Sequence, residues 1–194
     1  MSIDPHAVTR DSGTRMVDAH ETVVLVDERD REVGLAPKLQ AHERGLLHRA
    51  FSVFVLNARG EVLLQRRAFG KYHSGGLWTN TACGHPRPGE AVAAAARRRL
   101  REEMGFDCAL VPAGSFVYRR EVGDELVEHE LDHVFHGRHD APPHPDPAEV
   151  SEWRWMAPAA AIADAEAHPE RYTPWFALAL AELLDGGALD RAAA

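Results

Sequence analysis

The sequence predicts a mixed α/β fold in which a mixed β-sheet is sandwiched by helices. Three observations predict it: short β-branched runs typical of strands, a segment with apolar residues four positions apart, and a length of 194 residues that suits one domain. Apolar residues make up 45% of the chain, which is enough to form a core. We expect a flexible leader at residues 1–20, one domain at 21–186 and a flexible tail at 187–194.

The first half of the domain is predicted to be mainly β-structure. ETVVLVDE (21–28) is a short β-branched run, and a mixed stretch without a predicted element follows it. RAFSVFVLN and EVLLQRR flank a glycine-containing turn at 58–60 and predict a β-hairpin. A loop at 69–76 then leads into a further strand within LWTNTACGH (77–85).

The second half is predicted to alternate strands and helices. An apolar stripe predicts a helix over residues 90–104, with Gly105 as its stop. The stripe consists of Val92, Ala96, Leu100 and Met104. After this helix we expect, in order, paired strands in SFVYRREV and LVEHELDHVF around Gly123-Asp124, a proline-rich connection at 141–149, a strand in SEWRWM, and helices at 158–166 and 173–185.

Charge and composition exclude several classes of protein. Lys and Arg total 22 against 30 Asp and Glu, so the formal net charge is −8, which argues against a general nucleic-acid-binding protein. No apolar run reaches the length of a membrane span, and the N-terminus lacks the apolar core of a signal peptide. Cys83 and Cys108 form no disulfide framework. We therefore expect a soluble, cytoplasmic protein.

Residues 84–106, GHPRPGEAVAAAARRRLREEMGF, resemble the Nudix box, a loop and helix that present carboxylates to a divalent cation. The residues in register with the box are Gly84, Glu90, Arg98, Glu102, Glu103 and Gly105. One position departs, because the family pattern has Glu where this chain has Arg99. Arg99 and Glu103 share a helix face that could hold a phosphate and a metal ion side by side. The alternative is an ordinary charged amphipathic helix.

A second motif, WTNTACGHP (78–86), runs directly into this box. Together with HRAFSVF (48–54) and the altered Nudix box, it resembles the type I isopentenyl-diphosphate isomerases from about Glu21 to Trp175. The resemblance implies a Nudix-like fold and the interconversion of isopentenyl diphosphate and dimethylallyl diphosphate in isoprenoid biosynthesis. That reaction moves a proton across an allylic system and needs no redox cofactor.

The resemblance implies that two side chains carry the proton, Cys83 and Glu130. Cys83 and His85 are two apart on an extended segment and so face the same way, and a thiol beside a metal-binding histidine is a good proton carrier. Glu128 and Glu130 likewise share one strand face, opposite His129, and paired carboxylates repel unless a metal ion or a proton lies between them. The alternatives are an inert buried cysteine and a solvated strand face.

The resemblance also implies a metal site of three histidines and two glutamates, which are His42, His48, His85, Glu128 and Glu130. Mixed nitrogen and oxygen ligands suit Mn²⁺ or Mg²⁺, with Zn²⁺ as a further alternative. The spacing from His42 to His48 is six residues, against seven in some family members. We assign no role to His6, His20, His139, His144 and His168. Structural packing is the simpler expectation for His73, His133 and His136, whose roles stay open.

A site for the substrate follows from the same resemblance. Its expected cations are Lys38, Arg67, Lys71 and Arg99, which would hold the diphosphate by charge-assisted hydrogen bonds, while Glu103 would bind a bridging Mg²⁺. Tyr118 and Trp175 are expected at the hydrocarbon end, because an aromatic face attracts a carbocation-like centre. The Tyr118 hydroxyl could also hydrogen-bond the catalytic carboxylate. The alternatives are solvated surface cations and, for Trp175, core packing.

Two other functions compete with isomerisation. A Nudix hydrolase would cleave a nucleoside diphosphate derivative, but Arg99 removes a carboxylate from the metal cluster. A Nudix-like binding module would hold a phosphorylated ligand without chemistry, but it would not need Cys83, Glu128 and Glu130. The expected partner is therefore a small isoprenoid diphosphate, with no nucleic-acid or membrane partner, and the oligomeric state is not predicted.

Overall fold

The computed structural model describes residues 21–71, 73–123 and 125–187. The expected leader, Asp124 of the expected turn and all but the first residue of the expected tail lie outside these residues. No helix within them is long and apolar enough to cross a membrane.

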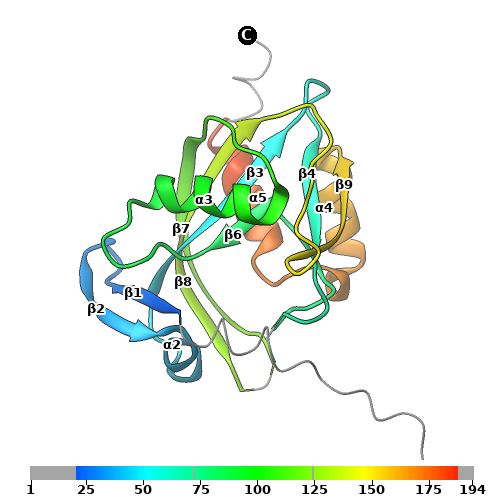
Figure 1. Cartoon of the computed structure of the whole chain (residues 1–194). Helices are drawn as coiled ribbons and strands as arrows, with labels where there is room; N and C mark the ends of the chain where they lie inside the picture. The colour runs from blue at the N-terminus through cyan, green and yellow to red at the C-terminus, as the bar shows by residue number, and fades with distance from the viewer. Residues whose placement is uncertain (1–20, 72, 124, 188–194) are drawn as a thin grey trace, which may run out of the picture.

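Nine strands of the described chain form one mixed sheet, as predicted. Strand β3 (His48–Leu56) is its centre (Figure 1). It pairs in parallel with β8 along its whole length, and antiparallel with β1, β6 and β4 in succession. The other strands are β1 (Thr22–Val26), β2 (Glu32–Pro37), β4 (Val62–Arg67), β5 (Trp78–Thr79), β6 (Ala82–Gly84), β7 (Val111–Glu121), β8 (Val127–Arg138) and β9 (Val150–Met156).

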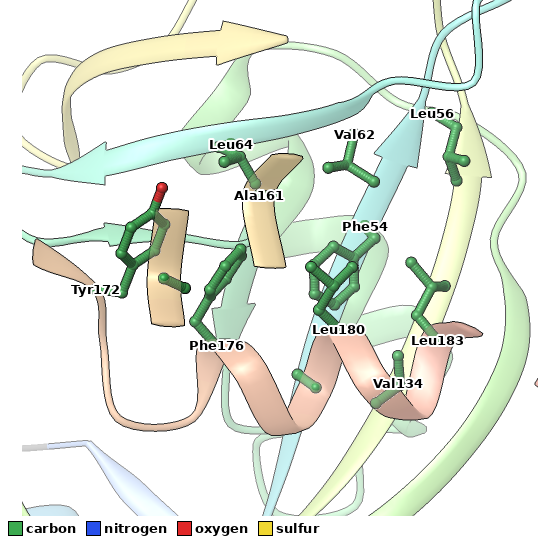
Figure 2. Close-up of a cluster of buried hydrophobic side chains, with 12 residues drawn as sticks. Phe54, Leu56, Val62, Leu64, Val134, Ala161, Tyr172, Phe176, Leu180 and Leu183 are labelled. Carbon is green, nitrogen blue, oxygen red and sulfur yellow. The ribbon is translucent and has the colours of Figure 1, made fainter. Parts of the chain in front are cut away.

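Helices cover both faces of this sheet, which confirms the predicted sandwich (Figure 1). The helices are α2 (Lys38–Arg44), α3 (Val92–Met104), α4 (Pro158–Ala167) and α5 (Phe176–Asp185), with a 3₁₀ turn at Pro169–Arg171. Alternate residues of β3 serve the two sides. Val53 and Val55 pack towards α3, whereas Phe54 and Leu56 pack towards α4 and α5. Figure 2 shows the second cluster, where Phe176 and other α5 residues lie against Phe54.

Two helices begin later than predicted, for local reasons. Helix α3 begins at Val92 rather than at residue 90, because Ala91 is extended and Glu90 is bound by Arg98 at 2.8 Å. Helix α5 begins at Phe176 rather than at residue 173, because the residue before Pro174 disfavours the helical conformation. The predicted stop at Gly105 is confirmed by its φ of 75°; a Cβ there would meet the His144 carbonyl oxygen.

The expectation of no helix or strand in the mixed stretch after β1 is wrong. This stretch contains β2 and α2, and α2 begins after Pro37 and ends at Gly45 in the left-handed conformation. The helix buries Lys38 and His42, so its seven residues carry no apolar stripe that would have predicted it. The single strand expected in LWTNTACGH is two short strands, β5 and β6. Between them, the Asn80 side chain donates to the Ala82 carbonyl oxygen and the Thr81 hydroxyl donates to the Leu63 carbonyl oxygen of β4.

Candidate active site

Three imidazole rings and a carboxylate converge beside the central strand. His42 lies on α2, His48 at the start of β3, His85 just after β6, and Glu130 on β8. One ligand atom from each lies within 4.8 Å of the others, and all four residues are buried. Four of the five expected metal ligands are therefore brought together, including His42 with its short spacing.

The strand register explains this convergence. Glu130 pairs with His48 across β3 and β8, and with Tyr118 across β7 and β8. Side chains that are paired in register point to the same face of a sheet. Glu130 therefore has an imidazole on one side and a phenol on the other. Helix α2 then adds His42, whose ring centroid lies 5.0 Å from that of His48.

The hydrogen bonds of these rings fit a bound cation. His48 Nδ1 lies 2.8 Å from the Leu46 carbonyl oxygen, so Nδ1 donates its proton there and Nε2 presents a lone pair. That Nε2 atom lies 3.3 Å from His42 Nε2 and 3.4 Å from Glu130 Oε1. Burial lowers the pKa of His42 to about 2 and also lowers the pKa of His85, which favours neutral rings. A carboxylate and lone pairs that face one another are satisfied by a divalent cation between them.

Glu128, the fifth expected ligand, lies beside this group rather than in it. The Tyr118 hydroxyl lies 2.6 Å from Glu130 Oε2 and 3.0 Å from Glu128 Oε2, and His73 Nε2 lies 3.4 Å from Glu128 Oε1. Burial and the charge of Glu130 raise the pKa of Glu128 well above its usual value. Burial also acts to raise the pKa of Glu130, but contacts with the His48 and His85 imidazoles hold this pKa well below its usual value. The pair therefore favours a protonated Glu128 and an ionised Glu130.

Cys83 lies on β6, in register with Ser52 of β3. It lines the same pocket as His85, which confirms that the two face the same way. Burial raises the pKa of the thiol to about 12, against the pull of Arg67, whose Nη1 lies 3.8 Å from Sγ. Cys83 is therefore a thiol that holds a proton.

The pocket that joins these groups has about 690 Å³ of empty space and opens to solvent. All four predicted cations line it, together with Glu103 and Trp175. Trp175 is buried, donates from Nε1 to Asn80 at 3.2 Å, and has the Arg67 guanidinium 5.6 Å from its ring centroid. Because Trp175 faces the pocket, core packing alone does not describe it.

Three of the four cations pair with carboxylates: Lys71 with Glu149 at 3.0 Å, and Lys38 and Arg99 as follows. Lys38 Nζ lies 3.1 Å from a Glu21 carboxylate oxygen. Burial acts to raise the pKa of Glu21, but the charge of Lys38 outweighs it and holds this pKa at about 2. Arg99 contacts Glu103 and Glu102, each at 2.9 Å, so the shared helix face of Arg99 and Glu103 is confirmed. Gln65 donates to the other Glu103 oxygen at 2.6 Å.

Several residues of the pocket were not found from the sequence. The sequence assigns no role to His73, yet this residue lines the pocket, with its ring edge against Trp175. Glu21, Gln65 and Glu149 also line it, and no sequence motif marks them. Asp132 had a signal, because it continues the alternation of Glu128 and Glu130; it accepts a hydrogen bond from Ser52 at 2.8 Å.

The remaining histidines on β8 lie elsewhere. His129 points away from the carboxylates, as predicted, and its Nδ1 lies 3.0 Å from the Gly45 carbonyl oxygen. His133 pairs with Asp30 at 3.1 Å, and neither it nor His136 lines the pocket.

Comparison with known proteins identifies close relatives. The NUDIX domain model matches residues 46–176. The chain is 52% identical over 174 residues to isopentenyl-diphosphate Delta-isomerase 2 of Aromatoleum aromaticum, covering 90% of this chain and 92% of that protein. It is 51% identical to the isopentenyl-diphosphate Delta-isomerase of Nocardia farcinica, covering 84% and 92%, and 51% identical to that of Burkholderia multivorans, covering 80% and 89%.

Solved structures share the fold at lower identity. The protein DR0079 from Deinococcus radiodurans aligns with a TM-score of 0.70 and 23% identity, covering 84% of this chain and 99% of that chain. An Ap4A hydrolase from Caenorhabditis elegans aligns with a TM-score of 0.53 and 18% identity, covering 72% and 97%. At these identities the likeness concerns the fold alone, and it confirms the predicted Nudix-like sheet.

Proposed function

The chain belongs to the NUDIX domain family and, within it, to the isopentenyl-diphosphate Delta-isomerases, and we propose that it interconverts isopentenyl diphosphate and dimethylallyl diphosphate in isoprenoid biosynthesis. One observation carries the proposal. His85 and Glu130 of the buried His–Glu cluster line a single pocket with the Cys83 thiol and the four cations. A hydrocarbon with a charged diphosphate needs such a pocket, with proton carriers at one end and cations at the other.

A divalent cation is proposed at His42, His48, His85 and Glu130. Mn²⁺ and Mg²⁺ suit these ligands, with Zn²⁺ as the third alternative, and Glu128 is the proposed fifth ligand because it is buried beside Glu130. When bound, the ion would supply positive charge beside the glutamates, which stabilises their ionised form at neutral pH. We propose a second ion, Mg²⁺, between Glu103 and the oxygens of the diphosphate.

Proton transfer is assigned to two groups on opposite sides of the substrate. Glu130, held by the Tyr118 hydroxyl at 2.6 Å, protonates one face of the double bond, and Cys83 removes a proton from the far carbon. In the forward direction a protonated Glu130 and a Cys83 thiolate become a carboxylate and a thiol, which are the forms described above, so a proton must pass from the thiol back to Glu130 before the next turnover. The reverse direction starts directly from the ionised Glu130 and the protonated thiol. Glu130 is buried and Cys83 is half-buried, which limits the access of bulk water to the carbocation-like centre.

The remaining pocket residues are proposed to bind and orient the substrate. Lys38, Arg67, Lys71 and Arg99 hold the diphosphate by charge-assisted hydrogen bonds. Trp175 lies across the hydrocarbon end, where its ring face stabilises positive charge. The Arg67 guanidinium lies close to both Trp175 and Cys83, so this cation borders the end of the pocket proposed for the hydrocarbon.

The direct test is incubation with isopentenyl diphosphate and Mg²⁺. We expect dimethylallyl diphosphate as the product, with no released phosphate, and incorporation of deuterium when the reaction runs in D₂O. Release of phosphate or of a nucleoside monophosphate from nucleoside diphosphate derivatives would instead identify a hydrolase. Tight binding of the substrate without turnover would identify a binding module.

A further inference from the structure

One residue without a sequence motif joins two of the substrate-binding cations. Glu149 precedes β9, and its Oε2 atom lies 3.0 Å from Lys71 Nζ and 3.0 Å from Arg99 Nη2. We propose that Glu149 is a positioning residue that sets the spacing of these two cations for the diphosphate. The inference rests on the proposed function, in which Lys71 and Arg99 bind that group.

The two cations come from different parts of the fold. Lys71 lies in the loop after β4, whereas Arg99 lies on α3, so no strand register fixes the distance between them. Because both nitrogen atoms contact one oxygen of Glu149, they lie no farther apart than twice 3.0 Å. That separation suits neighbouring oxygens of one diphosphate. Two cations so close repel each other, and the carboxylate between them offsets the repulsion.

The backbone holds Glu149 in this place. Its carbonyl oxygen accepts from the Ala68 amide at 2.9 Å, at the start of the loop that carries Lys71, and its own amide donates to the Asp146 carbonyl at 3.0 Å. The side chain lines the pocket and is 23% exposed. Burial acts to raise the pKa of Glu149, but Arg99 and Lys71 hold it below its usual value. An ionised carboxylate therefore ties the loop to the helix.

The opposite role for Glu149 predicts an effect of opposite sign. A carboxylate that merely fills the anion site would compete with the diphosphate, and its removal would tighten binding. If the carboxylate instead sets the spacing of the cations, its removal would weaken diphosphate binding, because Lys71 would leave its place beside Arg99.

The experiment compares Glu149→Gln with wild type and with Glu152→Gln as the matched control. Glu152 lies three residues along the chain, contacts Arg66 at 2.7 Å and does not line the pocket. KM and kcat are measured with isopentenyl diphosphate at saturating Mg²⁺, and binding of inorganic diphosphate is measured by calorimetry. We expect KM and Kd of Glu149→Gln to rise about tenfold, the size of one weakened charge-assisted contact, with kcat within about twofold of wild type. Glu152→Gln should match wild type.

A double-mutant cycle keeps the test specific to Lys71. If Glu149 acts by placing Lys71, Glu149→Gln should add little to the effect of Lys71→Met on diphosphate binding. Additive losses, an unchanged or lower KM, or a fall in kcat alone would overturn the proposal. A changed Mg²⁺ requirement with unchanged diphosphate binding would also overturn it, because Glu149 would then serve the ion. Failure of wild type to isomerise the substrate would reject the proposed function instead, while the diphosphate measurements would still test the spacing.

Discussion

The two ends of the pocket are organised by different physical means. At the His–Glu end, His48, Glu130 and Tyr118 are placed by the register of three adjacent strands, and the His42 and His85 rings, whose pKa values burial lowers, lie close to the Glu130 carboxylate. At the anion end, Lys71 and Arg99 come from a loop and a helix and are placed by a shared carboxylate. The first end is preorganised by the backbone, because strand register fixes its side chains. At the second end the cations are already present, and pairing with a carboxylate side chain keeps them in position.

This contrast predicts that metal removal has the largest effect. Exhaustive dialysis against EDTA should abolish turnover, because the cluster of His42, His48, His85 and Glu130 would lose the charge that its acceptor atoms need. Mg²⁺, with or without Mn²⁺, should restore activity. The measurement is turnover alongside metal content by elemental analysis. Full activity in metal-free protein would refute the assignment of the cluster.

Substitution of the proton carriers should have the second largest effect on turnover. Cys83→Ser and Glu130→Gln should each reduce turnover about 10²- to 10⁴-fold, because serine titrates far above a thiol and glutamine does not titrate. The fold and the diphosphate affinity should stay largely intact, since Lys38, Lys71 and Arg99 are paired with other carboxylates.

Metal content decides how these two variants are interpreted. Glu130→Gln also weakens the metal site, so Cys83→Ser with its metal confirmed is the cleaner variant. Wild-type turnover in that variant would leave Cys83 as a packed small residue.

A change at the anion end should affect binding more than chemistry. Arg99→Glu restores the common Nudix pattern and places a further carboxylate beside Glu102, Glu103 and Glu149. Loss of one contact to a charged group is worth about 1.5–3 kcal/mol, so KM for isopentenyl diphosphate should rise roughly ten- to a hundredfold. Steady-state kinetics checks this. An unchanged KM would show that Arg99 does not touch the substrate.

The smallest expected effect concerns the pairing of Glu21 with Lys38. The pKa of Glu21 in the fold is about 2, below its ordinary 4.5, so its ionised form stabilises the protein above pH 4.5. That contribution should be lost as the pH falls from 4.5 towards 2. Lys38, His85 and Arg99 are the charged or titratable groups that lower this pKa.

The corresponding measurement is the urea midpoint of Glu21→Gln between pH 7 and pH 3. We expect the variant to be less stable than wild type at pH 7, and the difference in midpoint to be clearly smaller, but not zero, at pH 3. Glu28→Gln, at an exposed position after β1, is the control. A difference that is constant with pH would mean that packing, rather than charge, is what the substitution removes.

The sequence predicted the strand-borne part of the site well, because strand geometry converts spacing into direction. Glu128 and Glu130 on one face, with His129 on the other, follow from the period of two, and the structure has this arrangement. The helix over 90–104 and its stop at Gly105 likewise follow from local patterns. These features depend on neighbours along the chain.

What could not be predicted depends on contacts between distant segments. Glu149 reaches Arg99 across 50 residues, and nothing in the proline-rich connection indicates that contact. Helix α2 buries Lys38 and His42, so its sequence resembles an exposed stretch. The place of His73 beside Glu128 depends on how the loop after β4 folds over the pocket. In each case tertiary packing, rather than local preference, decides the outcome.

The pairing of Glu130 with both His48 and Tyr118 limits how this enzyme can be altered. Deletion of one residue between Glu130 and the core residue Val134 would turn the first part of β8 over relative to the rest, exchanging the pocket-facing Glu128 and Glu130 for their neighbours on the other face. Substitutions along the strand are therefore graded in their effect, but single insertions and deletions are all-or-none. An attempt to graft this hairpin onto another NUDIX sheet should be aligned on Glu130, whatever the length of the turn that closes it.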